Sequence, residues 1–303
     1  MLIKSRRKNA ELLILKSLNL RMNLSEKDKQ HFFNLRKGYE GEVLFDSLIE
    51  KLSSECFILN DLLLKFNNTV FQIDSLIIFS ESIYLFEVKN YEGDYYYEAD
   101  RLYKRPNFEV TNPLNQLGRS ETLFRQLLLN LGYNIPIDPS VVFINPQFTL
   151  YQAPLNKPFI FPTQIDSYLK KLGITAKLTV RHKALADKLM SLHMEESPYK
   201  LLPAYDYDQL LKGITCAKCN SFSISIKRKK WWKCVCGECE HVELVATAVM
   251  RSVKEFKLLF PNEKITTNVI YEWCKVVESK KVIRGILAGT LKKVGVNQWS
   301  YYI

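Results

Sequence analysis

The chain has 303 residues, of which 47% are hydrophobic, 12% aromatic and 25% charged, and this composition excludes a disordered chain. Its length allows two or more domains. No apolar stretch approaches the roughly 20 residues that a membrane-spanning helix needs, and no signal-peptide pattern follows the basic N-terminus, so we expect a cytoplasmic protein with no membrane partner.

The net charge of +11 is concentrated in the last third of the chain. Residues 1–211 contain 26 Lys and Arg against 25 Asp and Glu, whereas residues 212–303 contain 17 against 7. A localised positive charge attracts polyanions, which indicates a nucleic acid as the partner of residues 212–303. A solubilising surface and an acidic membrane surface are the alternatives that charge alone leaves open.

Two helical patterns occupy the N-terminal part of the chain. Leucines recur at helical spacing in residues 8–22. The apolar spacing of residues 42–52 predicts a helix that begins just after Gly38 and Gly41, glycines that would allow close approach of another backbone or a substrate. Glu42 is then a further metal ligand or a partner of Lys89, or it is a first-turn glutamate favoured by the helix dipole.

Two largely apolar runs carry three charged residues. Residues 71–79 and 83–90 are rich in β-branched and aromatic side chains and are separated by polar residues, so they predict a hairpin of buried strands. The alternation of side chains places Glu87 and Lys89 on one face. Asp74 shares this face if the hairpin pairs it with Glu87 or Lys89, which is the register we assume; a shift by one residue would separate them.

Charged side chains in buried strands need a partner or a metal ion. Asp74, Glu87 and the backbone carbonyl of Val88 would supply oxygen ligands that suit Mg²⁺, with Mn²⁺ as a substitute. Lys89 would orient or deprotonate an attacking water, or offset charge on a phosphate. The hairpin therefore predicts metal-assisted hydrolysis of a phosphodiester, and a structural ion pair of Glu87 and Lys89 is the alternative.

A third helix has well-defined start signals. Asn112 fits the N-cap and Pro113 the first helical position. Gln116 then lies near the helix N-terminus, where amide donors favour phosphate. It either holds a phosphate or the attacking water, or is an ordinary exposed glutamine. A buried strand at 141–145 follows, and the order of helix, strands, helix and strand predicts an α/β layered domain.

Five of the seven cysteines lie within one short segment. Clustered cysteines without a secretion signal indicate a metal site. Cys216 and Cys219, followed by Asn, have the spacing of a zinc knuckle, in which backbone amides face the thiolates. A glycine after Cys236 favours Cys234 and Cys236 as the second knuckle, whereas Cys236 with Cys239 has the usual spacing but no following glycine. We predict a structural zinc site of Cys216, Cys219, Cys234 and Cys236, with Cys239 as the substitute.

Two features of the last 80 residues suit contact with DNA. Residues 227–233 form a basic ribbon with two tryptophans, which suits phosphate contact and base stacking or is a plain exposed hairpin. Residues 265–275 and 282–303 give two helical patterns and a short terminal strand. This order resembles a small winged helix, whose second helix enters a groove.

Four segments, 38–42, 72–74, 86–93 and 112–116, together resemble the nuclease-related domain (NERD) family, a branch of the PD-(D/E)xK restriction-endonuclease-like superfamily. They follow the family order and cover about residues 36–145. The resemblance implies a mixed central sheet flanked by helices, with Asp74 and Glu87 as Mg²⁺ ligands, Lys89 as the catalytic lysine, and Glu42 and Gln116 completing the site. Some family members carry a C-terminal zinc ribbon. The chain departs from the superfamily motif at Ile73, where a proline would precede the aspartate, and from the usual second zinc knuckle.

The predicted architecture is an α/β, restriction-endonuclease-like fold followed by a zinc ribbon and a small winged-helix-like domain. The expected segments are an N-terminal helical segment (1–35), the nuclease-like domain (36–212), the zinc ribbon (213–245) and the winged-helix-like tail (246–303). The predicted function is that of a Mg²⁺-dependent endonuclease or nickase acting on DNA. The alternatives are a catalytically silent DNA-binding protein on a nuclease fold, and an RNA-directed or defence-system accessory component. The sequence carries no signal of the oligomeric state.

Overall fold

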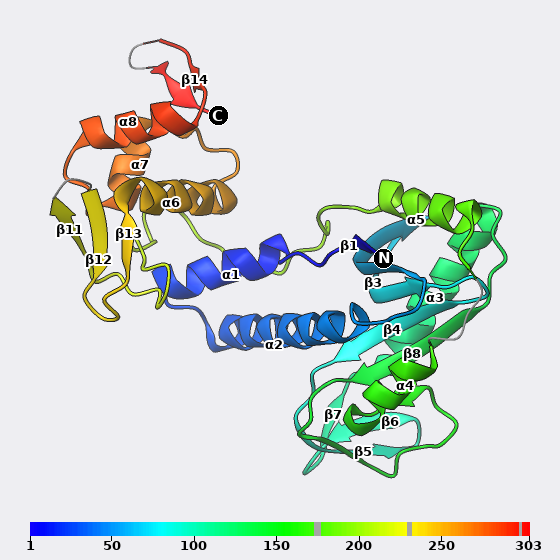
Figure 1. Ribbon diagram of the computed structural model, residues 1–303. Coiled ribbons are helices and arrows are strands. Elements are labelled where there is room, and N and C mark those ends of the chain that lie inside the picture. Colours follow the sequence, from blue (N-terminus) through cyan, green and yellow to red (C-terminus); the bar gives the residue numbers. More distant parts are fainter. Residues whose placement is uncertain (173–176, 229–231, 297–298) are drawn as a thin grey trace. The chain divides into compact units, whose positions relative to one another are not determined.

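The computed structural model describes residues 1–172, 177–228, 232–296 and 299–303 (Figure 1). They form two compact units: Met1–Asn9 with Phe33–Lys200, and Ala10–Phe32 with Leu201–Ile303. Helix α1 (Ala10–Arg21) groups with the C-terminal part of the chain because its Ile14 and Leu18 share a core with α6 (Val245–Leu259). The units therefore differ from the four consecutive segments expected from the sequence, whose boundaries stay a prediction.

The first unit is built on a mixed six-stranded sheet with the strand order β1-β2-β3-β4-β8-β10. Antiparallel pairs join β2 to β3 and β3 to β4, and the other neighbours run parallel. The strands are β1 (Leu2–Lys4), β2 (Phe57–Phe66), β3 (Thr69–Ile78), β4 (Ile83–Lys89), β8 (Ile137–Phe143) and β10 (Phe159–Ile160). The predicted hairpin of two buried strands is thus β3 and β4.

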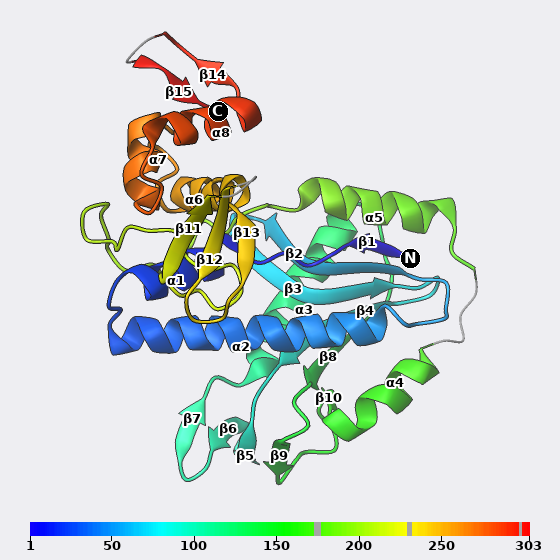
Figure 2. The same ribbon diagram turned by 60° about the vertical axis from the view of Figure 1, so that its left-hand side comes forward.

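Helices cover both faces of this sheet (Figures 1 and 2). The second half of α2 (Glu26–Ile49) and α4 (Ile165–Lys171), which follows the short 3-10 helix η1 (Pro162–Gln164), share one core with the sheet. On the other face, α3 (Pro113–Asn130) and α5 (Val180–Leu192) contribute side chains such as Phe124 and Leu185 to a second core. This mixed sheet flanked by helices confirms the predicted fold class.

A smaller sheet of four strands belongs to the same unit, with the order β7-β6-β5-β9. The four strands are β5 (Gly93–Glu98), β6 (Arg101–Lys104), β7 (Phe108–Val110) and β9 (Phe148–Tyr151).

Helix α2 corrects one expectation, because it runs without a break through both glycines instead of beginning after them. A glycine inside a helix costs about 1 kcal/mol relative to alanine, which packing of the helix against the sheet offsets. A Cβ on Gly41 would lie 2.5 Å from the Cβ of Asn90, so Gly41 is where the helix meets the end of β4. Glu42 consequently lies in the middle of α2 and not in a first turn.

The second unit has one core, which α1, α6, α7 (Thr267–Cys274) and α8 (Lys280–Thr290) share around the fully buried Trp273. A three-stranded sheet of β11 (Ile224–Arg228), β12 (Trp232–Cys236) and β13 (Val242–Leu244) precedes α6, and a hairpin of β14 (Lys293–Val294) and β15 (Tyr301–Tyr302) follows α8. The two helical patterns predicted at 265–275 and 282–303 correspond to α7 and α8, and the predicted terminal strand to β15, while the winged-helix-like arrangement stays a prediction. Among the described residues, none of the helices combines the length and the apolar character that crossing a bilayer requires.

Candidate active site

Asp74 and Glu87 lie side by side at the end of the β3–β4 hairpin. The ladder pairs Ser75 with Phe86, so the next residue on each strand brings the two carboxylates together. Both residues are buried, with exposed fractions of 5% and 2%. Beyond the ladder, Asp74 Oδ2 accepts a hydrogen bond of 2.9 Å from the backbone N–H of Val88. The register assumed from the sequence is therefore confirmed.

Lys89 lies on the same face as Glu87 and joins it to helix α3. Its Nζ is 2.6 Å from Glu87 Oε1 and donates a hydrogen bond of 3.1 Å to Gln116 Oε1. The start of α3 is fixed by Asn112, whose side chain accepts from the N–H of Leu114 at 3.1 Å. The structure thus brings Gln116 to the lysine of the hairpin.

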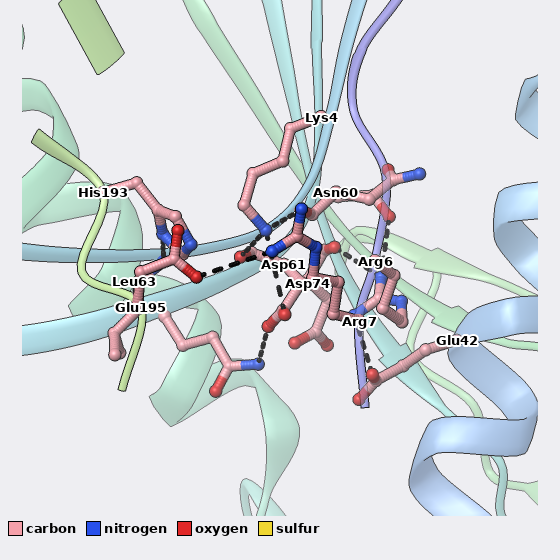
Figure 3. Close-up of polar contacts among 12 residues, drawn as sticks. Lys4, Arg6, Arg7, Glu42, Asn60, Asp61, Leu63, Asp74, His193 and Glu195 are labelled. Carbon is pink, nitrogen blue, oxygen red and sulfur yellow. Dashed lines mark hydrogen bonds and ion pairs between the residues drawn. The ribbon is translucent and has the colours of Figure 1, made fainter. Parts of the chain in front are cut away.

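Glu42 reaches this region from α2 and is held by Arg6 (Figure 3). Arg6 Nη1 donates to Glu42 Oε2 at 2.7 Å. Its Nε and Nη2 donate to the two oxygens of Asp46 at 2.9 and 3.1 Å, and Nη2 also reaches the backbone oxygen of Asp74 at 2.6 Å. One guanidinium therefore connects two carboxylates of α2 to the strand that carries Asp74.

Burial and crowding of carboxylates shift the ionisation of the site. Burial, and then the neighbouring Asp74, raise the pKa of Glu87 to about 8, although Lys89 opposes this shift. The same two causes raise the pKa of Glu42 to about 8 against the opposing charge of Arg6. Burial disfavours the charged form of Lys89, but Glu87 and Asp74 outweigh burial and raise its pKa. Carboxyl groups that ionise this reluctantly would be stabilised as anions by a divalent cation, and their oxygen donors fit Mg²⁺ or Mn²⁺.

Sequence reasoning missed Arg6 and Asp46. Asp46 follows Glu42 by four residues, so helical spacing places both carboxylates on one face of α2 and could have revealed it. Arg6 carries no such signal, because its partners lie 36 to 69 residues further along the chain.

A second cluster consists of thiols. The Sγ atoms of Cys216, Cys219, Cys236 and Cys239 all lie within 4.8 Å of one another. Zinc with four thiolates at about 2.3 Å separates the sulfurs by about 3.8 Å, so this cluster can bind zinc. The backbone N–H of Lys218 donates to Cys216 Sγ at 3.4 Å, a contact that stabilises the thiolate form that a metal requires.

The prediction of Cys234 as a ligand is wrong, and the substitute Cys239 takes its place. Cys234 is 1% exposed and shares the apolar core of the second unit with Val249 and Phe256. Burial, followed by the charge of Glu243, raises the pKa of its thiol to about 11. Cys234 is a core residue of strand β12.

The two knuckles have the same backbone hydrogen bonds. In each, the N–H of the first cysteine donates to the carbonyl five residues later, and its carbonyl accepts from the N–H four residues later. These bonds measure 2.8 and 3.0 Å for Cys216 with Ser221 and Asn220, and 3.0 and 3.1 Å for Cys236 with His241 and Glu240. The residue after the second cysteine is left-handed in both, with φ of +62° at Asn220 and +58° at Glu240.

Gly237, the glycine that favoured Cys234 and Cys236 as a pair of ligands, has a different structural role. The left-handed residue of the second knuckle is Glu240, whereas a Cβ on Gly237 would lie 2.6 Å from Ser223 Oγ. Gly237 therefore leaves space for the neighbouring chain and does not turn the knuckle. Gly237 is required for packing, and in the sequence it resembles the glycine of a zinc knuckle.

A mixed sheet between helices, with an Asp and a Glu-x-Lys at the end of a hairpin and a Glu from a helix, is the arrangement expected of restriction-endonuclease-like proteins. A model of the nuclease-related domain (NERD) family matches residues 37–144. This stretch is therefore a nuclease-related domain, which confirms the resemblance and indicates a nuclease-related function. Neither the curated proteins nor the solved structures contain a match to the chain.

Proposed function

We propose that the protein is a Mg²⁺-dependent endonuclease or nickase that hydrolyses phosphodiester bonds of DNA. One observation supports this above the others: Asp74 and Glu87 are buried side by side, with the ammonium of Lys89 2.6 Å from Glu87. Two adjacent buried carboxylates are costly unless a cation compensates them. Lys89 supplies one positive charge and Arg6, which Glu42 and Asp46 share, supplies a second, so the four carboxylates of this region outnumber their cations.

Each residue of the site has a role that follows from its contacts. Asp74, Glu87 and the carbonyl of Val88 would hold Mg²⁺ or Mn²⁺, which when bound would activate a water and polarise the phosphate. The N–H of Val88 orients the Asp74 carboxylate. Lys89 would orient or deprotonate the attacking water, or offset negative charge on the phosphate. Gln116 accepts from Lys89 and keeps the ammonium in place.

Zinc in the four-cysteine cluster would be structural, because protein thiolates fill all four positions. It would anchor the β11–β12 hairpin, on which Lys227 pairs with Lys233 and the Arg228 guanidinium lies 4.3 Å from the ring centre of Trp232. A basic surface with an aromatic ring suits phosphate contact and stacking. The rest of the predicted ribbon, residues 229–231, lies outside the described residues.

Helix α8 would contribute to the same binding activity. Lys281 and Arg284 are exposed on it, as expected of the second helix of a winged-helix-like tail. DNA as the partner is a proposal supported by the basic charge of residues 212–303 and by the nuclease-related domain. The cytoplasmic location remains a prediction from the sequence.

Cleavage of supercoiled plasmid in Mg²⁺ tests the proposal. We expect the wild-type chain to nick or linearise the plasmid, and Lys89→Ala and Asp74→Ala to lower the rate by about 100-fold or more, since each removes charge stabilisation from the reacting phosphate. Lys65→Ala, which removes an exposed lysine of β2, is the matched control and should cleave normally.

A gel-shift assay on the same samples separates the competing functions. If the wild-type chain and both variants shift the plasmid equally and leave it intact, the protein is a DNA-binding protein on a silent nuclease fold. Cleavage of RNA in place of DNA would favour an RNA-directed role.

A further inference from the structure

The first residues of the chain lie outside the matched domain and yet line the candidate active site. Strand β1 pairs in parallel with β2. At its end, Lys4 Nζ donates to the backbone oxygens of Asn60 and Asp61 at 2.9 and 2.7 Å. Lys4 is 9% exposed, so these bonds are shielded from water. These bonds anchor the segment that carries Arg6, two residues further along the chain.

Arg6 is hydrogen-bonded through all three nitrogens of its guanidinium group. Its side chain is 3% exposed and its three nitrogens donate to Glu42, Asp46 and the backbone of Asp74. The planar fork of a guanidinium can serve several acceptors in fixed directions, which an ammonium cannot. Figure 3 shows Arg6 between β1 and the end of Glu42.

Loss of this fork would act on Glu42 in two ways. Glu42 and Asp46 are four residues apart on α2 and repel each other when no cation lies between them. A glutamate without a partner also samples several rotamers, and holding it for a ligand then costs entropy. Both effects, together with the repulsion between Glu42 and Asp74, would move Glu42 out of the orientation that Arg6 gives it.

We propose that Arg6 is a positioning residue, which holds Glu42 in the orientation from which it serves as the third carboxylate for a divalent cation beside Asp74 and Glu87. The inference rests on the proposed nuclease function and extends the site to a segment that precedes the matched domain. Arg6 would contact neither the substrate nor the cation and would act through Glu42.

The neighbouring Arg7 supplies a matched control. Its side chain is 81% exposed, and its Nη1 lies 3.8 Å from Glu195 Oε2. Arg7→Gln removes the same charge from the same segment as Arg6→Gln does, but it leaves the contacts of α2 intact. A general electrostatic effect would appear in both variants, whereas a positioning effect would appear only in Arg6→Gln.

The proposal is tested by titrating the full, zinc-loaded chain with Mn²⁺ and measuring the bound and free ion by electron paramagnetic resonance. We expect Arg6→Gln and Glu42→Gln each to weaken Mn²⁺ binding by about 10- to 100-fold, the usual cost of losing a group that orients a ligand or the ligand itself. Arg6→Lys should not restore affinity, because it keeps the charge but loses the fork. The double variant should bind no worse than the weaker single variant, and Arg7→Gln should stay within about twofold of wild type.

Several outcomes would overturn this assignment. Unchanged or tighter Mn²⁺ binding by Arg6→Gln would show that Arg6 is dispensable or competes with the cation. Multiplied losses in the double variant would show that Arg6 does not act through Glu42. If Arg6→Gln does not fold, wild-type affinity in Arg6→Lys would equally contradict the proposal. A wild-type chain that neither binds Mn²⁺ nor cleaves DNA would instead overturn the proposed function itself.

Discussion

Cys234 and Cys236 are two residues apart on one strand and have different roles. Cys236 lies at the end of β12, where the chain turns into the second knuckle, whereas Cys234 lies within the strand and faces the core. The side chains of alternate strand residues share a face, so periodicity alone cannot separate a ligand from its core neighbour. Cys236 joins the thiol cluster because it is the last residue of β12, where the chain turns into the knuckle.

Replacing single cysteines should reveal this difference. We expect Cys239→Ala to lose the bound zinc and much of the stability of the second unit, because it removes one of four ligands. Cys234→Ala should retain one zinc per chain and lose about 1 kcal/mol of unfolding free energy through a small cavity. Zinc content by mass spectrometry and thermal unfolding measure the two effects, and loss of zinc from Cys234→Ala alone would contradict the assignment.

The catalytic candidates divide into those that local pattern could predict and those that it could not. Asp74, Glu87 and Lys89 were predicted because strand alternation and a hairpin register are short-range properties. Gln116 was predicted because helix capping fixes where α3 begins. Arg6 depends on the pairing of β1 with β2, more than 50 residues apart, and no periodicity encodes such a pairing.

At the scale of elements, α2 shows how tertiary contact overrides local propensity. The sequence around Gly38 and Gly41 reads as a helix boundary, but the helix continues. The four-stranded sheet depends on the pairing of β5 with β9, which joins segments about 55 residues apart and which no local pattern encodes.

The two glycines of α2 provide a matched pair of substitutions. Gly38→Ala adds a methyl group at a point where none of the described residues lies within 4 Å, so we expect a gain of about 0.5–1 kcal/mol from helix propensity. Gly41→Ala places a Cβ 2.5 Å from Asn90 Cβ and 3.0 Å from Ile144 Cγ2, so it should destabilise the first unit by about 1–3 kcal/mol and lower cleavage by displacing Glu42. Chemical denaturation and the plasmid assay measure both, and equal behaviour of the two variants would contradict the close contact at Gly41.

At the scale of the whole molecule, the grouping of α1 with the C-terminal residues affects how DNA binding should be tested. Deleting residues 213–303 would expose the buried side chains of α1, including Leu18, which is 0% exposed. A truncated chain would therefore lose stability and binding together. Substitutions of exposed residues in the full chain avoid this ambiguity.

Neutralising α8 should weaken DNA binding in a salt-dependent way. We expect Lys281→Gln with Arg284→Gln to reduce the slope of log K against log salt by about 1.8, if each side chain neutralises one phosphate. Lys170→Gln with Lys171→Gln on α4 removes two exposed charges from the first unit and is the matched control. Fluorescence anisotropy at several salt concentrations gives the slopes, and an unchanged slope in the α8 variant would exclude this helix from the interface.

The long reach of Arg6 has a consequence for folding kinetics. Its acceptors lie 36, 40 and 68 residues away in sequence, so these bonds close long loops and form late in comparison with the β3–β4 hairpin. Until β1 docks, Glu42 and Asp46 face each other without their shared cation. The acidic centre would therefore reach its final arrangement after the β3–β4 hairpin, and a refolding experiment should recover the hairpin before it recovers metal affinity.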